Sequence, residues 1–298
     1  MHNQEGSKLF FIINPISGGK EKHDWEREIR EYLKDSPHTM EFYLLTGKAD
    51  DRTSVKHYLD QLQPEKVIAV GGDGTVKFVA EMLRGTSIAL GILPAGSANG
   101  MARELELPLT AREALDVVIN GTRRAIDLIK INNEHLCIHL SDVGLNALLV
   151  KYFEQSKKRG MWGYGKAVLR VLWQKQKMYA TIHTNEGVHK RKAYMVVLAN
   201  ARKYGTGANI NPGGDLSDGR FEIVVVRKLN LLEIFKAIFT DKSFHPRRIE
   251  VFSTTRVQIS TTRRAYFQVD GEYLGKTRSV TAEIMHHALS VIIPAEAK

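Results

Sequence analysis

The 298-residue sequence contains one cysteine and has no long apolar run. A single thiol excludes an intrachain disulfide, which fits a reducing compartment. Cys137 lies in an apolar stretch, so we expect a buried structural thiol. The longest apolar runs, such as residues 223–226, fall far short of the roughly 18 to 20 residues that cross a bilayer. Residues 1–7 also lack the order of a secretory signal. We therefore expect a cytoplasmic protein that meets membranes only peripherally.

Acidic residues are in the minority. Forty-three Lys and Arg against 33 Asp and Glu give a formal net charge of +10. Such a surplus favours polyanionic partners, which include nucleotides, anionic lipid head groups and nucleic acid. No recognised nucleic-acid-binding signature accompanies the charge, so we expect no nucleic-acid partner. With 43% hydrophobic residues, the chain is long enough for two domains with separate cores.

The first 121 residues alternate short apolar runs with amphipathic stretches, which indicates strand-helix units around a parallel sheet. Residues 9–13, 67–70 and 89–93 are the expected buried strands. Thr110 and Glu113 form a capping-box pattern, and Asn120-Gly121 is a helix stop signal. We place the boundary of a first, α/β domain there, at residues 1–122.

Strand patterns dominate residues 123–298 and predict an antiparallel β domain. Helical insertions are expected at residues 146–157 and 163–176, and hairpin turns at residues 132–133 and 185–187. The expected strands are residues 125–131, 135–140, 179–183, 193–198, 221–226, 257–260, 266–269 and 280–284.

A glycine-rich segment joins the third expected strand to a helix. Its residues are Gly71, Gly72, Asp73, Gly74 and Thr75. The glycines let backbone N–H groups approach an anion, and the helix that follows presents its positive end to it. Phosphate suits such a place, and Asp73 could orient a metal ion beside it. A tight turn with an Asp cap is an equally plain interpretation.

Small and polar residues also follow other strands of the first half. They are Asn14, Pro15, Ser17 and Gly18 after the first strand, Thr46 after residues 41–45, and Ser97 and Asn99 after residues 89–93. Open α/β sheets bind ligands at the carboxyl ends of their strands. These residues are therefore expected to share one site.

The three segments around Asn14, Asp73 and Ser97 together resemble the diacylglycerol kinase catalytic-domain family, which includes sphingosine and ceramide kinases. Their types and order match that family's ATP-binding segments. The resemblance implies a Rossmann-like, NAD kinase-like α/β domain followed by a β-rich antiparallel sandwich, with the last strand able to pack back on the first domain. It also implies an ATP-dependent lipid kinase that uses Mg²⁺ and phosphorylates diacylglycerol or a related lipid such as a sphingoid base.

The resemblance extends to two acidic segments of the second half. By position, Asp215, Asp218 and the carbonyl of Arg220 match a structural Mg²⁺ site, and oxygen ligands suit that cation. An Asp-Gly turn without metal is the alternative. Asp270-Gly271-Glu272 matches the segment whose glutamate, here Glu272, is the family's proton acceptor, with Asp73 beside the transferred phosphate. A solvated hairpin carboxylate is the alternative for Glu272.

The sequence departs from common bacterial members at Lys77-Phe78 and Gly100, and Ser97 stands where Thr is frequent. These changes leave the acceptor lipid open. Two rivals stay open as well: an NAD kinase-like small-molecule kinase, and an inactive lipid-binding regulator. Basic and aromatic residues interleave within residues 151–179, which predicts contact with an anionic membrane surface at the inner face of the membrane. Core aromatics flanked by solvated cations are the alternative there. A homodimer is also left open.

Overall fold

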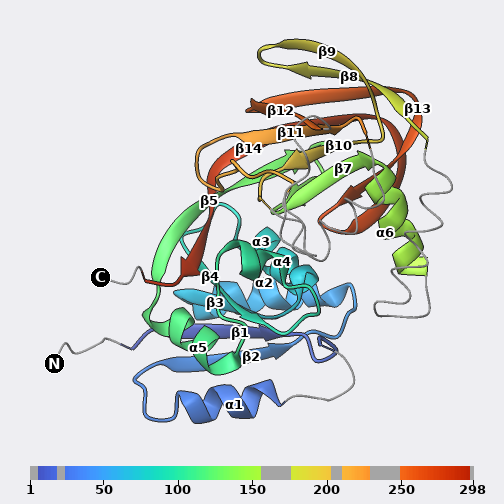
Figure 1. Cartoon of the computed structure of the whole chain (residues 1–298). Helices are drawn as coiled ribbons and strands as arrows, with labels where there is room; N and C mark the ends of the chain where they lie inside the picture. The colour runs from blue at the N-terminus through green and yellow to red at the C-terminus, as the bar shows by residue number, and fades with distance from the viewer. Residues whose placement is uncertain (1–5, 19–23, 156–175, 203–209, 229–248, 296–298) are drawn as a thin grey trace. The chain divides into compact units, whose positions relative to one another are not determined.

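A computed structural model describes residues 6–18, 24–155, 176–202, 210–228 and 249–295 of the chain (Figure 1). The chain divides into two compact units. Unit 1 comprises residues 1–126 and 287–298, and unit 2 comprises residues 127–286. The predicted domain boundary at residue 122 concerns parts of the chain that fold independently. It stays a prediction.

Unit 1 is built on a parallel sheet with the strand order β14-β4-β3-β1-β2. The strands are β1 (Lys8–Ile13), β2 (Thr39–Leu44), β3 (Lys66–Gly71), β4 (Ala89–Pro94) and the end of β14 (Glu272–Ile293). Strands β1, β3 and β4 are almost wholly buried because helices cover both faces of the sheet, which explains their continuous apolar runs. The predicted α/β fold of the first half is confirmed.

Within the described residues of unit 1, five helices accompany this sheet. They are labelled in Figure 1. They are α1 (Trp25–Tyr32), α2 (Asp50–Leu62), α3 (Asp73–Leu83), α4 (Gly100–Glu104) and α5 (Ala111–Asn120). Helices α1 and α5 pack on one face around Phe11, while Phe10, on the other face, stacks on Tyr58 of α2. Helix α5 begins and ends where the capping pattern predicts, although the Thr110 hydroxyl bonds the Glu113 carboxylate and caps no backbone N–H.

Unit 2 is a β-rich sandwich with antiparallel pairing between its strands. Its strands are β5 (Thr122–Ile131), β6 (His135–Cys137), β7 (Leu140–Gly144), β8 (Met178–Thr184), β9 (Gly187–Ala193), β10 (Met195–Ala199), β11 (Phe221–Val226), β12 (Ile249–Thr254), β13 (Arg256–Val269) and β14. Side chains of β11 alternate between two core clusters, so both faces of this strand are buried. Helix α6 (Leu145–Gln155) packs beside the cluster that contains Val224 and Val226.

Four strand predictions for unit 2, at residues 135–140, 257–260, 266–269 and 280–284, are wrong in their bounds. The strand expected at residues 135–140 ends after Cys137, and β7 begins at Leu140. The N–H groups of Ile138 and His139 donate to the Asp270 carboxylate instead of continuing a ladder. Residues 257–260 and 266–269 belong to one strand, β13, whose pairing with β14 is irregular between Ser260 and Ala265. The strand expected at residues 280–284 is likewise one part of the 22-residue β14.

Both predicted hairpin turns are confirmed. Residues 132–134 separate the paired Ile131 and His135 of β5 and β6, and Asn132 and Asn133 adopt φ of +52° and +62°, which asparagine accepts. Helices α2 and α4, strands β9 and β12 and all but the first residue of β7 were not predicted. The predicted helix at residues 163–176 lies almost wholly outside the described residues. Within the part of the chain that the structure describes, no helix is both long and apolar enough to cross a membrane.

Candidate functional site

The glycine-rich turn between β3 and α3 lies at the carboxyl edge of the unit 1 sheet. Gly71 is buried, and a Cβ on it would overlap the Thr75 side chain. The N–H of Thr75 donates to the Gly72 carbonyl at 2.9 Å, which closes the first turn of the helix. A Cβ on Gly74, by contrast, would meet no protein atom within 4 Å. The turn is therefore packed on its inner side and open at Gly74.

The segment after β1 lies against this turn. The amide Nδ2 of Asn14 donates to Thr75 Oγ1 at 3.3 Å, and the Asn14 backbone N–H donates to the Val70 carbonyl at 2.9 Å. Gly18 has φ of +82°, and a Cβ there would lie 2.6 Å from the Ala95 carbonyl oxygen. Glycine is thus required at Gly18 for both conformation and space. Pro15 and Ser17 complete this loop, Pro15 being exposed.

The segment after β4 lies at the same edge of the sheet, beside the two segments described above. A Cβ on Gly96 would overlap the Cα atom of Gly72, so the two turns touch backbone to backbone. Asn99 holds its turn closed, since Oδ1 accepts from the Gly96 N–H at 2.8 Å and Nδ2 donates to the Gly96 carbonyl at 2.9 Å. The Asn99 amide is therefore used inside the loop, while Ser97 is exposed.

Asp73 lies between two helix starts. It begins α3, and its Oδ1 accepts from the Met101 N–H in the first turn of α4 at 3.1 Å. Gly100 is buried at the first position of α4, so the departure noted there lies beside Asp73. The second departure, Phe78, lies under the guanidinium of Arg52 at 5.6 Å from the ring centroid.

Thr46 is held by a carboxylate that sequence analysis missed. Buried Asp51 accepts hydrogen bonds from the Thr46 N–H and hydroxyl, the Gly47 N–H and the Tyr43 hydroxyl. Burial alone would raise the pKa of Asp51, but the hydrogen bonds from Thr46, Tyr43 and Gly47 outweigh it and lower the pKa. The Thr46 hydroxyl therefore anchors the loop after β2. An Asp in the first turn of a helix, four residues after a glycine, was the signal that could have revealed it.

In unit 2, the predicted metal loop is shaped by its own carboxylates. Asp215 accepts from the Ser217 N–H and hydroxyl, and Asp218 accepts from the Arg220 N–H at 2.9 Å. The Arg220 guanidinium binds Ser253, so this residue would offer a metal its carbonyl. Two exposed carboxylates and a carbonyl in one short loop are an oxygen donor set that fits a hard divalent cation. The metal assignment itself stays a prediction.

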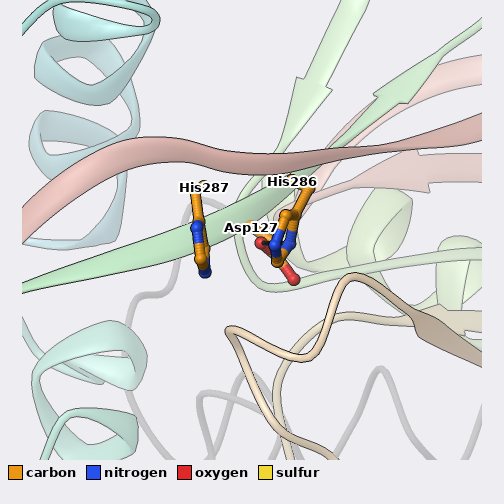
Figure 2. A group of neighbouring side chains, drawn as sticks. All are labelled: Asp127, His286 and His287. Carbon is orange, nitrogen blue, oxygen red and sulfur yellow. Dashed lines mark hydrogen bonds and ion pairs between the residues drawn. The ribbon is translucent and has the colours of Figure 1, made fainter.

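Asp127 and His286 fasten this loop to the sheet. The N–H of Asp127 donates to the Leu216 carbonyl at 2.6 Å, and Asp127 Oδ2 accepts from the Gly219 N–H at 2.6 Å. The buried carboxylate also lies 2.9 Å from Nδ1 of His286 (Figure 2). Figure 2 also shows the ring of the next residue, His287, on the same side of β14; its φ of +50° permits this. Asp127 was not predicted from the sequence, because its partners come from distant parts of the chain.

Asp270 and Gly271 form a two-residue hairpin turn between β13 and β14, and Glu272 is the first residue of β14. Asp270 and Gly271 adopt φ of +49° and +82°, and Val269 pairs with Glu272. The Asp270 carboxylate accepts three backbone N–H groups, from Ile138, His139 and Leu140. Asp270 therefore fixes the turn, while Glu272 is exposed at its end.

A buried polar network lies directly behind this turn. Gln268 donates its Nε2 to Asp142 Oδ2 and accepts the Gly271 N–H on Oε1 at 2.7 Å. Asp142 also accepts from Asn146 Nδ2 at 2.6 Å and the Ala147 N–H at 2.9 Å. Burial raises the pKa of Asp142 to about 6, against the hydrogen bonds from Asn146, Gln268 and Ala147. Nothing in the local sequence marked Asp142 or Gln268, which are 126 residues apart.

Only the ends of the predicted membrane segment are described. Lys151 lies 5.3 Å from the ring centroid of Tyr266 and 5.7 Å from that of Tyr273, and Tyr152 packs on the core. At the other end Tyr179 is exposed and Lys192 lies over its ring at 5.0 Å. Residues 156–175, which hold most of the basic and aromatic side chains, lie outside the described residues.

Two protein-family models match consecutive parts of the chain. Residues 8–131 match the diacylglycerol kinase catalytic domain, and residues 141–293 match the YegS C-terminal NAD kinase beta sandwich-like domain. Together the two matches cover both halves of the sequence in the order that the predicted fold requires.

Curated relatives match over nearly the whole chain. The "Probable lipid kinase YegS-like" of Pectobacterium atrosepticum is 28% identical over 96% of this chain and 95% of its own. A diacylglycerol kinase of Staphylococcus saprophyticus is 26% identical over the same shares. The crystal structure of a diacylglycerol kinase from Bacillus anthracis superposes with a TM-score of 0.73 at 20% identity, over 96% of this chain and 97% of that one, which shows a shared fold.

Proposed function

Because this chain belongs to the diacylglycerol kinase catalytic-domain family, we propose that it transfers the γ-phosphoryl group of ATP to the hydroxyl of a lipid. The acceptor is diacylglycerol, which gives phosphatidic acid, or a related lipid such as a sphingoid base. The family of lipid kinases is established; the donor and acceptor are the proposal.

One observation carries the proposal. Three segments after three parallel strands meet at one edge of the unit 1 sheet. Glycine is needed at Gly18 and Gly96 where they touch, and a Cβ on Gly72 would lie 3.1 Å from the Gly96 Cα atom. The turns lie too close for side chains, so their backbone N–H groups can face a phosphate chain. The start of α3 adds its positive end to the same place. Triphosphate is the ligand that this edge suits best.

The chemistry asks mainly for positioning, because phosphoryl transfer depends on alignment and charge stabilisation. A divalent ion, when bound, neutralises charge on the phosphates. Asp73 orients the phosphate end of the nucleotide, with its carboxylate held by the Met101 N–H. Glu272 accepts the proton of the acceptor hydroxyl as the new O–P bond forms and the bond to the leaving ADP oxygen breaks. Asp215, Asp218 and the Arg220 carbonyl hold a structural Mg²⁺ that stiffens their loop.

The acceptor is reached from a membrane surface. Residues 151–179 carry the basic and aromatic side chains that suit anionic head groups. Flotation with vesicles of phosphatidylcholine, with and without phosphatidylglycerol, checks this part. Recovery of the chain should rise with the anionic lipid at low salt and fall at high salt; equal recovery from both vesicles at low salt contradicts it.

An acceptor panel tests the activity. Labelled ATP is supplied with diacylglycerol, monoacylglycerol, a sphingoid base, ceramide or NAD, and the products are separated. Phosphorylated lipid is expected with at least one lipid acceptor. Labelled NADP alone would favour the NAD kinase rival, and no product with any acceptor would favour an inactive lipid-binding regulator.

Gly74→Ala tests the nucleotide site independently of the acceptor. A Cβ at Gly74 meets no protein atom within 4 Å, and the residue is in the first turn of α3. The variant should therefore be as stable as the wild type or up to about 1 kcal/mol more stable, since alanine favours helix. Its affinity for ATP should nevertheless fall by about tenfold or more, because the methyl group takes the space of a phosphate. Unchanged affinity in calorimetric titration would place the triphosphate elsewhere.

Glu272→Gln tests the proton acceptor. The amide keeps the size of the side chain but cannot take a proton, so kcat should fall by about 10² to 10⁴ while the KM for ATP stays unchanged. Glu283→Gln, on the exposed side of the same strand, is the matched control and should keep wild-type activity. A fully active Glu272→Gln enzyme removes Glu272 from this role.

A further inference from the structure

The amide of Gln268 connects the turn that carries Glu272 to the start of α6. Gln268 is buried on β13, its Nε2 lies 2.5 Å from Asp142 Oδ2, and its Oε1 accepts the Gly271 N–H at 2.7 Å. Its backbone carbonyl accepts the Ser141 hydroxyl at 2.6 Å. Gln268 therefore touches both β7 and the turn, in a place closed to water.

The direction of these hydrogen bonds depends on Asp142. An ionised carboxylate only accepts, and Asp142 receives donors from Asn146, Ala147 and Gln268. The NH₂ group of Gln268 must then face Asp142, which leaves its oxygen facing the Gly271 N–H. Rotating the amide by half a turn would set two donors against each other at Gly271. Asp142 thus determines which end of the Gln268 amide meets the turn.

We infer that Gln268 is a positioning residue for Glu272, and that Asp142 acts through Gln268 by fixing the orientation of its amide. The Asp270 carboxylate holds one side of the turn through three N–H groups of residues 138–140, and Gln268 holds Gly271, the residue directly before Glu272. With both residues of the turn anchored, the chain enters β14 in one direction. The inference rests on the proposed role of Glu272.

A purely structural role for Gln268, in which it only fills the core and completes hydrogen bonds there, would give a different response to substitution. Loss of such a residue lowers the stability of the fold and affects every activity alike. Loss of a positioning residue lowers kcat and leaves the KM for ATP unchanged, because the nucleotide segments of unit 1 are untouched. The test therefore exchanges donor and acceptor while keeping the shape of both side chains.

The experiment compares Gln268→Glu, Asp142→Asn and the double variant that combines them. Gln268→Glu sets two carboxylates against each other. Asp142→Asn replaces one of the two accepting oxygens by an NH₂ group, which then faces either the NH₂ groups of Gln268 and Asn146 or the Ala147 N–H. Each single variant should lower kcat by about tenfold or more. In the double variant the amide introduced at position 142 donates to the carboxylate introduced at position 268. The other oxygen of that carboxylate accepts from Gly271, while Asn146 rotates its amide to accept. This variant should recover kcat to within about threefold of the wild type. Gln258→Glu, exposed on the same strand, is the control and should keep wild-type kcat.

Hydrogen exchange at the Gly271 amide reads the same contact without any activity. The amide should be protected in the wild type and the double variant and should exchange about tenfold faster in both single variants. If the wild type phosphorylates no lipid, the proposed function fails, while this measurement still decides whether Gln268 and Asp142 hold the turn. Wild-type kcat and protection in both single variants overturn the inference, and so does a double variant as impaired as the single ones.

Discussion

Asp142→Asn should make the stability of the chain less sensitive to pH. Asp142 is a buried carboxylate of β7, and burial raises its pKa to about 6 from an ordinary value of 3.8. The folded chain therefore prefers the protonated form more than the unfolded chain does. The stability that this preference contributes is fully present below pH 3.8 and is lost as the pH rises to about 6.

The size of the effect follows from the two pKa values. A difference of about 2.2 units at about 1.36 kcal/mol per unit gives about 3 kcal/mol. Asparagine carries no charge, so the variant does not lose this stability as the pH rises. At pH 4 the wild-type carboxyl is protonated and carries a donor, as the asparagine amide does, so the two proteins should be about equally stable there. By pH 7 the difference in free energy of unfolding should have moved by about 3 kcal/mol in favour of the variant.

Urea unfolding between pH 4 and pH 7.5, followed by circular dichroism, measures the effect. The quantity of interest is the difference in free energy of unfolding between variant and wild type at each pH. Asp35→Asn, in the exposed loop after α1, is the control, and its difference from the wild type should stay constant. Parallel curves for Asp142→Asn and the wild type would refute the reasoning, because they would mean that Asp142 has the same pKa in the folded and unfolded chain.

Three further predictions concern the loops. Gly96→Ala should weaken ATP binding by about tenfold or more in titration calorimetry, since its Cβ overlaps Gly72; unchanged affinity would mean that this contact is not needed. Asp51→Asn should cost about 1–3 kcal/mol in urea unfolding near pH 7, because an amide oxygen cannot accept all the donors around Thr46. The pKa of Asp51 is lowered, so this stabilisation should be present above pH 3.8 and lost as the pH falls further; equal stabilities at pH 7 would contradict it. Mg²⁺ should raise the melting temperature of the wild type, chelation should reverse this, and Asp218→Asn should abolish it; an equal rise in both proteins would place the metal elsewhere.

Short-range patterns predicted much of the architecture. The strands around Phe11 and Ile68, the helix from α3's first turn onward and the hairpin at Asn132 and Asn133 all follow from periodicity or from residues that accept positive φ. The glycines at Gly72 and Gly96 were visible as turn residues too. Their contact with each other was not, because it depends on neighbouring strands whose register the sequence does not give.

The carboxylates show most clearly what local sequence patterns reveal and what only the folded chain reveals. Asp270 was chosen from its motif, but its three N–H partners lie 130 to 132 residues away and break a strand that the sequence predicts as continuous. Asp142 and Gln268 belong to no local pattern, and they become a pair only because β13 pairs with β7. Asp127 became the anchor of the acidic loop in the same way.

The sequence by itself determined the family, the α/β half followed by the β-rich half, and the turns with glycine or asparagine, since these depend on residue type and short-range spacing. Tertiary structure alone decided how the carboxylates and amides are paired and oriented. The physical reason is that a buried polar group takes its charge state and direction from partners that only the folded chain brings within hydrogen-bonding distance.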